Sequence, residues 1–266
     1  MNTRVNKKSR ARLSQQQRWE RIQNQLETQP MVLISNLAEE FNVVPETVRR
    51  DIDAMAERRM LERIHGGAIA IRTAMEPSIQ QRALQASEPR HRIAQQACRI
   101  VHDRDVLMMD SCATCFTLAE QLSVERDQLI VLTNSFPIAQ ILARNPTFAV
   151  HIAGGLFQAG DAGTWGSETT EYLGRFVADH CFSSCSAIDS DGPSEVNSGF
   201  AAVKRVMFKR ARRRSLLVDH AKFRPPKLER VAALAEIDDL FTDREPPADF
   251  VQAAEVANLN IHIADE

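Results

Sequence analysis

The 266-residue sequence has no apolar run that approaches the roughly 18 residues needed to cross a membrane as a helix. Its first residues, MNTRVNKKSRAR, are basic and precede no apolar segment of the kind that marks a secretory signal. Apolar and charged fractions of 44% and 26% are typical of a soluble globular protein. We therefore expect a cytoplasmic protein with no membrane partner.

Cysteine is scarce, and an odd count of five does not favour a framework of paired disulfides. Cys112 and Cys115 form one C-x-x-C motif, but no second C-x-x-C or C-x-x-H completes a tetrahedral zinc set. Cys181 and Cys185 lie four residues apart in an apolar stretch. We expect no metal site and no cofactor, and a thiol or metal sensor built on Cys112 and Cys115 remains an alternative hypothesis.

The net charge of −2 hides an asymmetry along the chain. Residues 1–65 hold 12 Lys and Arg against 9 Asp and Glu, a net of +3, so the remainder carries −5. Residues 1–12 contribute five basic side chains and no acid. A basic end on an acidic body suits an N-terminal segment that meets a polyanion, although a solubilising tail would have the same charge.

The stretch from Val43 to Asp53 predicts one short helix with its chemistry on one side. Pro45 suits the first helical position, and the spacing of three apolar residues predicts a face that docks on a core: Val48, Ile52 and Met55. The other face is polar, with two acids beside it: Glu46, Thr47, Arg49 and Arg50, then Asp51 and Asp53. Paired arginines can read guanine edges or hold phosphate, whereas the plainer alternative is a solvated helix face.

The flanking segments favour the DNA-reading interpretation. A helix capped by Ser14 runs to about residue 27, a short strand covers 31–34, and a helix capped by Ser35 leads into a tight turn before Pro45. Strand-like runs at 61–64 and 68–71 around Gly66-Gly67 predict a hairpin. We therefore expect a winged helix-turn-helix domain over residues 14–71, in which Arg63 and His65 touch phosphate or the minor groove.

Residues 72–90 are polar and hold two prolines, which predicts a hinge before a larger domain over 91–266. In that domain the pattern alternates between helices and strands, which indicates an α/β fold with a parallel sheet. We expect strands at 105–109, 129–133, 148–152, 215–218 and 259–263, and an apolar run at 180–188 that leads to Asp189. The expected helices cover 93–101, 115–122, 137–143, 168–177 and 201–212.

Ligands of such sheets bind at the carboxyl ends of the strands, so the loops there carry the candidate site. Small and hydroxyl residues follow three strands, where backbone N–H groups and a helix start could hold an anion, and a lysine follows a fourth. These residues are Ser111, Cys112, Ala113 and Thr114; Thr133, Asn134 and Ser135; Gly154 and Gly155; and Lys222. Any one of these loops could be an ordinary turn, but together they predict a site for a small phosphorylated ligand.

Four motifs in order resemble the DNA-binding domain of the DeoR-type bacterial repressors. They are R-x-x-x-I (18–22), L-A-E-x-F-x-V (37–43), E-T-V-R-R-D-I (46–52) and R-x-H-G-G-A (63–68). The resemblance implies that the Glu46–Met55 helix enters the major groove with Thr47, Arg49 and Arg50 in contact, and we count Pro45 and Glu46 among the DNA-binding residues. This chain has Val44 where the family usually places a capping Ser, and Arg59-Met60 where it usually places a Gly before the wing.

The resemblance continues through L-T-N-S-x-P-I (132–138), A-G-G (153–155), Ile188-Asp189 and V-D-H-A-K-F (218–223). These look like the family's sensor domain, which is similar to ribose-5-phosphate isomerase. The resemblance implies a sugar-phosphate effector, a phosphate loop at Ser111–Thr114, and contacts from Asp189 and Lys222. The chain reads D-S-C-A-T where the family commonly reads D-S-G-T-T. Its loops lean toward the deoxysugar branch, typified by the fucose-operon regulator.

We therefore expect a sequence-specific repressor of a carbohydrate-catabolism operon that binds an operator in double-stranded DNA. A sugar phosphate would control it, and it would act as a homo-oligomer, a dimer or a tetramer. The main alternative is a sugar-phosphate isomerase with an appended DNA-binding head. That enzyme would need a carboxylate base, for which Asp189 is the one strong candidate, and no convincing partner for it is evident. We expect no enzymatic activity and no catalytic residues.

Overall fold

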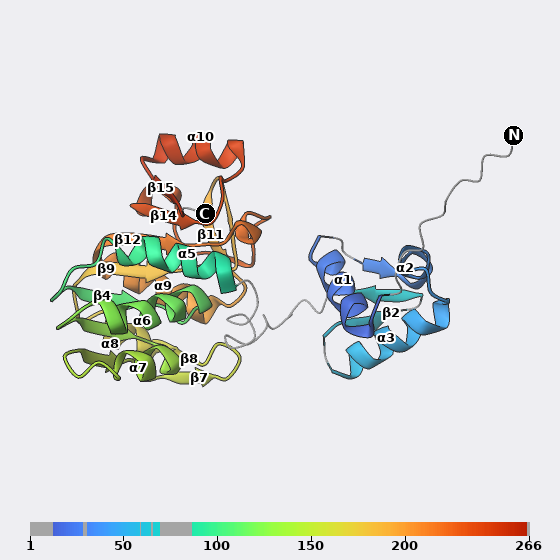
Figure 1. Ribbon diagram of the computed structural model, residues 1–266, viewed down its shortest axis with the longest axis horizontal. Helices are drawn as coiled ribbons and strands as arrows, with labels where there is room; N and C mark the ends of the chain where they lie inside the picture. Colours follow the sequence, from blue (N-terminus) through green and yellow to red (C-terminus); the bar gives the residue numbers. More distant parts are fainter. Residues whose placement is uncertain (1–12, 29–30, 59, 65, 70–86, 265–266) are drawn as a thin grey trace, which may run out of the picture. The chain divides into compact units, whose positions relative to one another are not determined.

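The computed structural model describes residues 13–28, 31–58, 60–64, 66–69 and 87–264. The chain divides into two compact units, 1–75 and 76–266, drawn in Figure 1. The expected hinge at 72–90 lies outside the described residues as far as residue 86. Residues Ser87–Cys98 form a helix. No helix in the described part of the chain is long and apolar enough to cross a membrane.

The described part of the N-terminal unit contains three helices and a three-stranded antiparallel sheet. In chain order they are α1 (Gln15–Thr28), β1 (Met31–Leu33), α2 (Ile34–Phe41), α3 (Pro45–Glu57), β2 (Glu62–Ile64) and β3 (Gly67–Ile69). The strand order is β1-β3-β2, so β3 pairs with both neighbours. Three helices followed by this small sheet make a winged helix-turn-helix, as the sequence predicted.

The apolar faces of the three helices meet in one core. Trp19 and Ile22 from α1, Leu37 from α2, and Val48 and Ile52 from α3 are all buried there. The 3.6-residue spacing of these side chains explains why each short helix forms, because each turns one apolar stripe toward the other two. Val48, Ile52 and Met55 lie on the inner face of α3, as expected.

Two local expectations in this unit were wrong. Asp51 does not lie beside the exposed arginines; it is buried against α1 with 2% of its surface exposed. Helix α2 begins at Ile34 after an extended Leu33, so Ser35 lies inside the first turn and is not the cap. Ser14 does cap α1. Its Oγ accepts the Gln17 N–H at 3.3 Å, and the Ser14 N–H donates to Gln17 Oε1 at 3.0 Å.

Asp51 is held by four side-chain bonds from α1. Arg18 donates to it through Nε at 2.6 Å and through Nη2 at 3.1 Å, Trp19 Nε1 donates at 3.1 Å, and Gln15 Nε2 donates at 3.3 Å. The carboxylate is therefore paired and hydrogen-bonded, which is what makes its burial tolerable. This contact fixes α3 against α1 and so sets which side of α3 faces outward.

The C-terminal unit is built on a seven-stranded parallel sheet of order β15-β14-β12-β9-β4-β5-β6. Its strands are β4 (Val106–Met109), β5 (Ile130–Thr133), β6 (Ala149–Ile152), β9 (Ala178–Ser183), β12 (Ala211–Leu217), β14 (Asp239–Thr242) and β15 (Asn260–Ile263). Because all of them are parallel, their carboxyl ends meet at one edge. The α/β expectation with a parallel sheet is confirmed.

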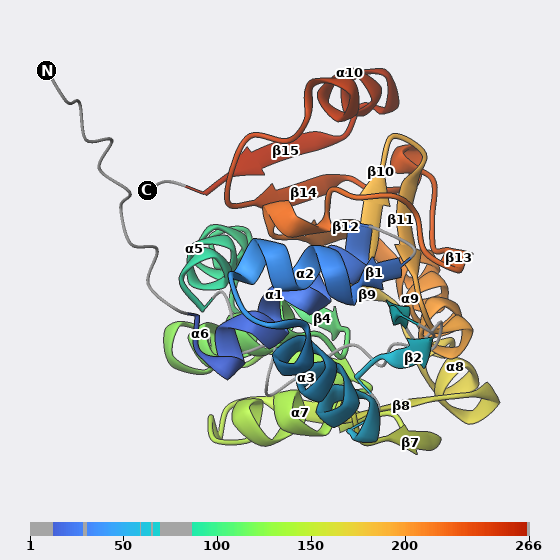
Figure 2. The same cartoon turned by 90° about the vertical axis from the view of Figure 1, so that its right-hand side faces the viewer.

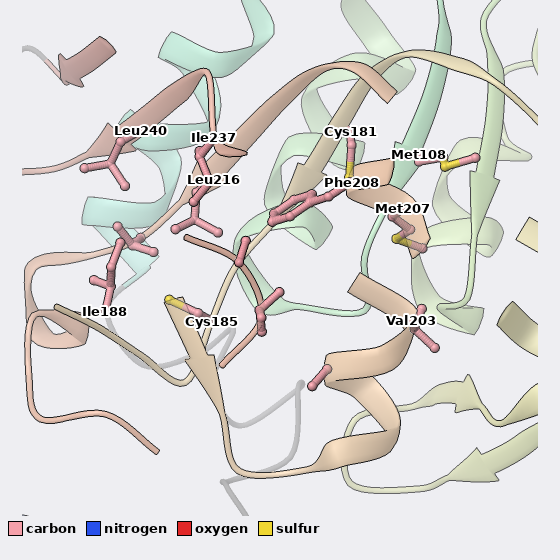
Figure 3. Packing of buried hydrophobic residues seen from close by; sticks show 14 of the residues in the cluster. Met108, Cys181, Cys185, Ile188, Val203, Met207, Phe208, Leu216, Ile237 and Leu240 are labelled. Atoms are coloured by element: carbon pink, nitrogen blue, oxygen red, sulfur yellow. The ribbon is translucent and has the colours of Figure 1, made fainter. Parts of the chain in front are cut away.

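Helices cover both faces of this sheet, as Figure 2 shows. Helices α5 (Ser87–Cys98), α6 (Ala113–Glu125) and α7 (Phe136–Leu142) pack on one face over Leu107, Val131 and Phe182. Helices α8 (Ser167–Leu173) and α9 (Ser198–Arg210) pack on the other. Figure 3 shows that second core, in which Met207 and Phe208 of α9 lie near strand residues such as Met108. The central strands are apolar on both sides because both sides are covered.

Several elements were not expected from the sequence. They are β7 (Leu156–Gln158) paired with β8 (Gly163–Trp165), the small sheet of β10 (Ala187–Asp189), β11 (Gly192–Glu195) and β13 (Glu229–Arg230), the short turns η1 (His220–Lys222) and η2 (Leu234–Glu236), strand β14, and α10 (Ala248–Ala257). The expected run at 180–188 was wrong as one unit. Strand β9 stops at Ser183, and Asp189 belongs to a separate antiparallel sheet.

Replacing Asp51 with Asn tests the contact between α1 and α3. The change removes the charge that Arg18 faces in a buried setting, so we expect the N-terminal unit to lose about 3 kcal/mol of stability. Amide hydrogen exchange of peptides from α1 and α3 measures the loss. Glu40→Gln is the matched control, because Glu40 forms an exposed pair with Arg21 at 3.9 Å. Equal protection in both variants would contradict the assignment.

Candidate functional site

The outward face of α3 carries the predicted DNA-contacting residues. Pro45, Glu46, Arg49 and Arg50 are exposed and Thr47 is half-buried. Glu46 lies in the first turn and faces both arginines: Arg49 Nη1 donates to Glu46 Oε2 at 2.6 Å, and Arg50 Nε lies 3.6 Å from Glu46 Oε1. Exposed ion pairs of this kind are worth about 0–1 kcal/mol, so the arginines can exchange Glu46 for another acceptor at little cost.

The helix starts without a side-chain cap. Val44 is extended and 63% exposed, and its side chain accepts no hydrogen bond from the first turn. The missing cap was expected from the sequence, and Pro45 at the first position compensates in part because its φ suits a helix.

The wing lies beside this face. Arg63 of β2 is exposed and pairs with Asp53 of α3, and a hollow of about 450 Å³ is lined by Ile34, Arg49, Arg63, Ile64 and Gly66. Gly67 is required here, since a Cβ on it would come within 2.0 Å of the Val32 carbonyl oxygen of the paired strand. His65 lies outside the described residues. The structure thus brings Arg49 and Arg63 to one surface.

At the carboxyl edge of the large sheet, side chains tie the predicted loops together. The N–H of Ser111, after β4, donates to Asn134 Oδ1 at 3.1 Å, and the Asn134 amide donates to the Thr164 carbonyl at 2.8 Å. Ser111 Oγ donates to the Asp161 carbonyl at 2.6 Å. Asn134 is fully buried, and its bond to the Ser111 N–H holds the loop after β4 in place.

The other loop residues divide between packing and the edge itself. Thr133 Oγ1 accepts the Ser135 N–H at 3.0 Å, while the buried Ser135 Oγ has no hydrogen-bond partner among the described residues. Gly155 needs to be glycine, because its φ is +146° and a Cβ would lie 2.2 Å from Thr169 Oγ1. A Cβ on Gly154 would meet nothing within 4 Å. Ala113 and Thr114 are buried in the first turn of α6.

Asp189 and Lys222 lie in different settings from the phosphate loop. Asp189 of β10 accepts from Arg230 Nη1 at 2.5 Å and from the Asp191 N–H at 3.0 Å. Although partial burial raises the pKa of Asp189, the bonds from Arg230 and the Asp191 backbone outweigh it, and the net pKa is lowered. Lys222 ends the η1 turn after β12 and is half-buried. Among the described residues, neither side chain forms a hydrogen bond or an ion pair with the loop after β4.

A buried ionic cluster at the same edge was missed by the sequence reasoning. Lys204 of α9 is 4% exposed, and its Nζ lies 2.5 Å from Asp110 Oδ2, 3.0 Å from Glu195 Oε1 and 2.7 Å from the Ser184 carbonyl. Burial opposes the charge on Lys204, but Asp110 and Glu195 outweigh it and raise its pKa well above the usual value. The lysine is therefore a permanent cation.

The cluster leaves one polar atom unused. Asp110 Oδ2 also accepts from Ser183 Oγ at 3.0 Å, and Glu195 Oε2 accepts from Ser186 Oγ at 2.7 Å. Asp110 Oδ1 is buried and has no hydrogen-bond partner in the part of the chain that the structure describes. A buried carboxylate oxygen without a donor costs about 1–3 kcal/mol or more, so this atom marks a place where a ligand hydroxyl would be favourable.

A signal for Lys204 was present in the sequence. Phe200, Lys204 and Phe208 follow one another at four-residue spacing on α9, and both phenylalanines are buried. A lysine at the centre of an apolar helical stripe must be paired with acids, because an isolated buried charge is too costly. The acids come from the end of β4 and from β11, and β11 was not expected.

Matches with known proteins agree with this architecture. A family model described as the DeoR-like helix-turn-helix domain matches residues 18–74, and one described as the DeoR C-terminal sensor domain matches residues 85–244. The chain belongs to the DeoR family. The family expectation drawn from the sequence motifs is therefore confirmed.

Named relatives span nearly the whole chain. The HTH-type transcriptional repressor CsqR of Escherichia coli is 30% identical over 88% of this chain and 89% of its own length. The glycerol-3-phosphate regulon repressor of Escherichia coli is 29% identical over 90% and 95%. The L-fucose operon activator of Haemophilus influenzae is 30% identical over 80% and 86%. This DeoR-family chain is thus a DNA-binding transcriptional regulator and not an enzyme.

Among solved structures, a D-ribose-5-phosphate isomerase resembles the chain with a TM-score of 0.40 at 12% identity, over 52% of this chain and 54% of that one.

Within the described residues, no group of three or more His, Cys, Asp or Glu side chains is arranged to hold a metal ion.

Replacing Lys204 with Met tests the buried cluster of this DeoR-family protein. The change leaves Asp110 and Glu195 buried without their cation, so we expect a loss of about 3–5 kcal/mol in the stability of the C-terminal unit. The loss is read from amide exchange in peptides from α6 and α9. Lys209→Met on the same helix is the control, because Lys209 is exposed and its replacement should change stability by less than about 0.5 kcal/mol. Similar exchange in the two variants would show that the cluster is not a main support.

Proposed function

We propose that this DeoR-family regulator represses a carbohydrate-catabolism operon and that a phosphorylated sugar bound to its C-terminal unit controls its affinity for DNA. Two observations support the proposal. The names of two relatives refer to glycerol-3-phosphate, a phosphorylated polyol, and to L-fucose, a sugar. The carboxyl edge of the sheet offers a helix start and a buried carboxylate oxygen in want of a donor.

The DNA contacts that we propose lie on α3 and the wing. Arg49 and Arg50 read base edges or hold phosphate, and Pro45, Glu46 and Thr47 place the start of the helix against the groove. Glu46 keeps the two guanidinium groups on the outward side until DNA replaces it. Arg63 and His65 meet the backbone or the minor groove at the wing. Asp51 carries no contact of its own and holds the helix in place from behind.

One such helix reads only a few base pairs, so specific binding needs two heads. We propose a homodimer or a tetramer that reads half-sites separated by one helical turn or a multiple of it. The sugar phosphate binds one arrangement of the heads better than another. Its differential affinity then shifts the population of the two arrangements, which is the only way in which a ligand can move such an equilibrium.

The effector site that we propose begins at α6. Helix N-termini favour anions, so the phosphate lies against the backbone N–H groups of Ser111–Thr114. Asp110 Oδ1 accepts a hydroxyl of the sugar, and Thr133, Asn134, Ser135, Gly154 and Gly155 shape the loops around it. Asp189 and Lys222 remain candidates on the rim, because both follow from the resemblance to the family and not from a contact seen here.

Replacing Arg50 with Ala tests the DNA-reading face. We expect affinity for a site selected from random duplexes to fall by roughly 5- to 150-fold, which corresponds to about 1–3 kcal/mol for a bidentate base contact. Gel-shift titration at one fixed salt concentration measures it. Arg21→Ala on α1 removes the same charge from the same unit and serves as control. Unchanged affinity in both Arg49→Ala and Arg50→Ala would show that α3 is not the reading helix.

A thermal-shift screen against phosphorylated sugars tests the sensor. A ligand at 100 times its dissociation constant stabilises the folded state by about 2.7 kcal/mol, so at least one sugar phosphate should raise the melting temperature. We expect Asp110→Asn to lose that increase, because the ligand hydroxyl loses its charged acceptor. Asp239→Asn is the matched control: Asp239 is also fully buried and paired, with Arg213, but lies at the start of β14. Loss of the increase in both variants, or in neither, would contradict the proposed site.

A further inference from the structure

The first turn of α6 places two cysteines next to each other at the edge of the sheet. Cys112 is the extended residue that caps the helix, and its Sγ accepts the Cys115 N–H at 3.2 Å. The three-residue spacing puts both side chains on one side of the turn. Cys115 is fully buried and its Sγ lies 3.3 Å from the Phe182 carbonyl, whereas Cys112 is 5% exposed. Cys112 is therefore the less buried of the two cysteines.

The surroundings give the two sulfurs different proton affinities. Burial by itself raises the pKa of Cys112, but the hydrogen bonds from the Cys115 thiol and N–H and the charge of Lys204 outweigh burial and Asp110, so the net pKa is lowered. The pKa of Cys115 is raised well above the usual value by burial and by its hydrogen bond to Cys112. Of the two sulfurs, Cys112 is therefore the one that ionises more easily.

Cys98 and Cys181 lack this arrangement. Burial raises the pKa of Cys98 to about 11 and the pKa of Cys181 well above the usual value. Neither caps a helix, since Cys98 ends α5 and Cys181 lies in the middle of β9. The sheet edge beside Cys112 also holds Asp110 Oδ1, a buried acceptor that has no donor among the described residues. The cysteine pair thus lies close to a buried acceptor, since the Cys112 N–H also donates to the Asp110 carbonyl at 2.9 Å.

We propose that Cys112 and Cys115 form a reversible dithiol–disulfide site that reacts with small disulfides, with Cys112 as the attacking sulfur and Cys115 as the resolving one. The Cys112 thiolate attacks one sulfur of the reagent, forms a mixed disulfide and releases the first thiolate. Cys115 passes its proton to that thiolate, attacks Cys112 Sγ and releases the second thiolate, which takes up a proton from solvent. The protein dithiol is oxidised by two electrons, and one disulfide is reduced to two thiols. This inference is independent of the identity of the effector.

The test uses the full chain and glutathione disulfide as the probe. We expect the wild-type chain to lose the mass of two hydrogens, and a peptide linking Cys112 to Cys115 to appear in non-reducing digests. Cys115→Ser lacks the resolving sulfur and should accumulate a glutathione adduct on Cys112. The matched control, Cys98→Ser, removes a different buried cysteine and should behave as the wild type does. No adduct in Cys115→Ser, or adducts spread over Cys98, Cys181 and Cys185, would overturn the proposal.

A second measurement on the unaltered chain keeps the test independent of any variant's folding. Brief treatment of the native protein with iodoacetamide at pH 7 should label Cys112 at least about tenfold faster than the other four cysteines, because the thiolate is the reacting form. Equal rates at all five, or faster labelling elsewhere, would overturn the assignment of Cys112 as the attacking sulfur.

Discussion

A single buried ammonium group joins the parts of the C-terminal unit that meet at the carboxyl edge of its large sheet. Lys204 reaches from α9 to Asp110 at the end of β4, to Glu195 on β11 and to the backbone after β9. Each buried ion loses several kcal/mol of hydration, so the three charges are tolerable only together. Because Asp110 also begins the loop that leads into α6, the position of that loop depends on Lys204. Lys204 thus connects the small sheet of β10, β11 and β13 to the large parallel sheet.

The N-terminal unit uses the same physical device on a smaller scale. Asp51 points inward from α3 to Arg18 and Trp19 of α1, and its neighbours Arg49 and Arg50 point outward. The buried carboxylate of Asp51 thus holds one side of α3 against α1, while the arginines on its other side stay exposed. In each unit a buried carboxylate supports the surface that we propose to bind a polyanion or an anion. That carboxylate takes no part in neutralising the bound negative charge.

The sequence predicted what depends on local pattern and on periodicity. The apolar stripe at Val48, Ile52 and Met55 identified the docked face of α3, and the alternation of helices and strands identified the parallel sheet. The sequence did not predict that Asp51 is buried. Asp51 lies three residues after Val48, and this spacing indicates burial only when the width of the core is known. Strand β14 and the strands of the sheet of β10, β11 and β13 are short, and β11 pairs with β13, which is distant in sequence. Hence Glu195 and Lys204 could not be joined to Asp110 before the fold was known.

The charges of the cluster limit what kind of effector the proposed site can hold. Asp110, Glu195 and Lys204 together carry −1, so a phosphate placed directly on Asp110 Oδ1 would meet repulsion at close range. The start of α6 is the favourable place for the anion, and Asp110 Oδ1 needs a donor instead. A ligand that satisfies both must carry an anionic group at one end and a hydroxyl group a short distance away. Inorganic phosphate lacks the second feature and a neutral sugar lacks the first, whereas a phosphorylated sugar or polyol has both.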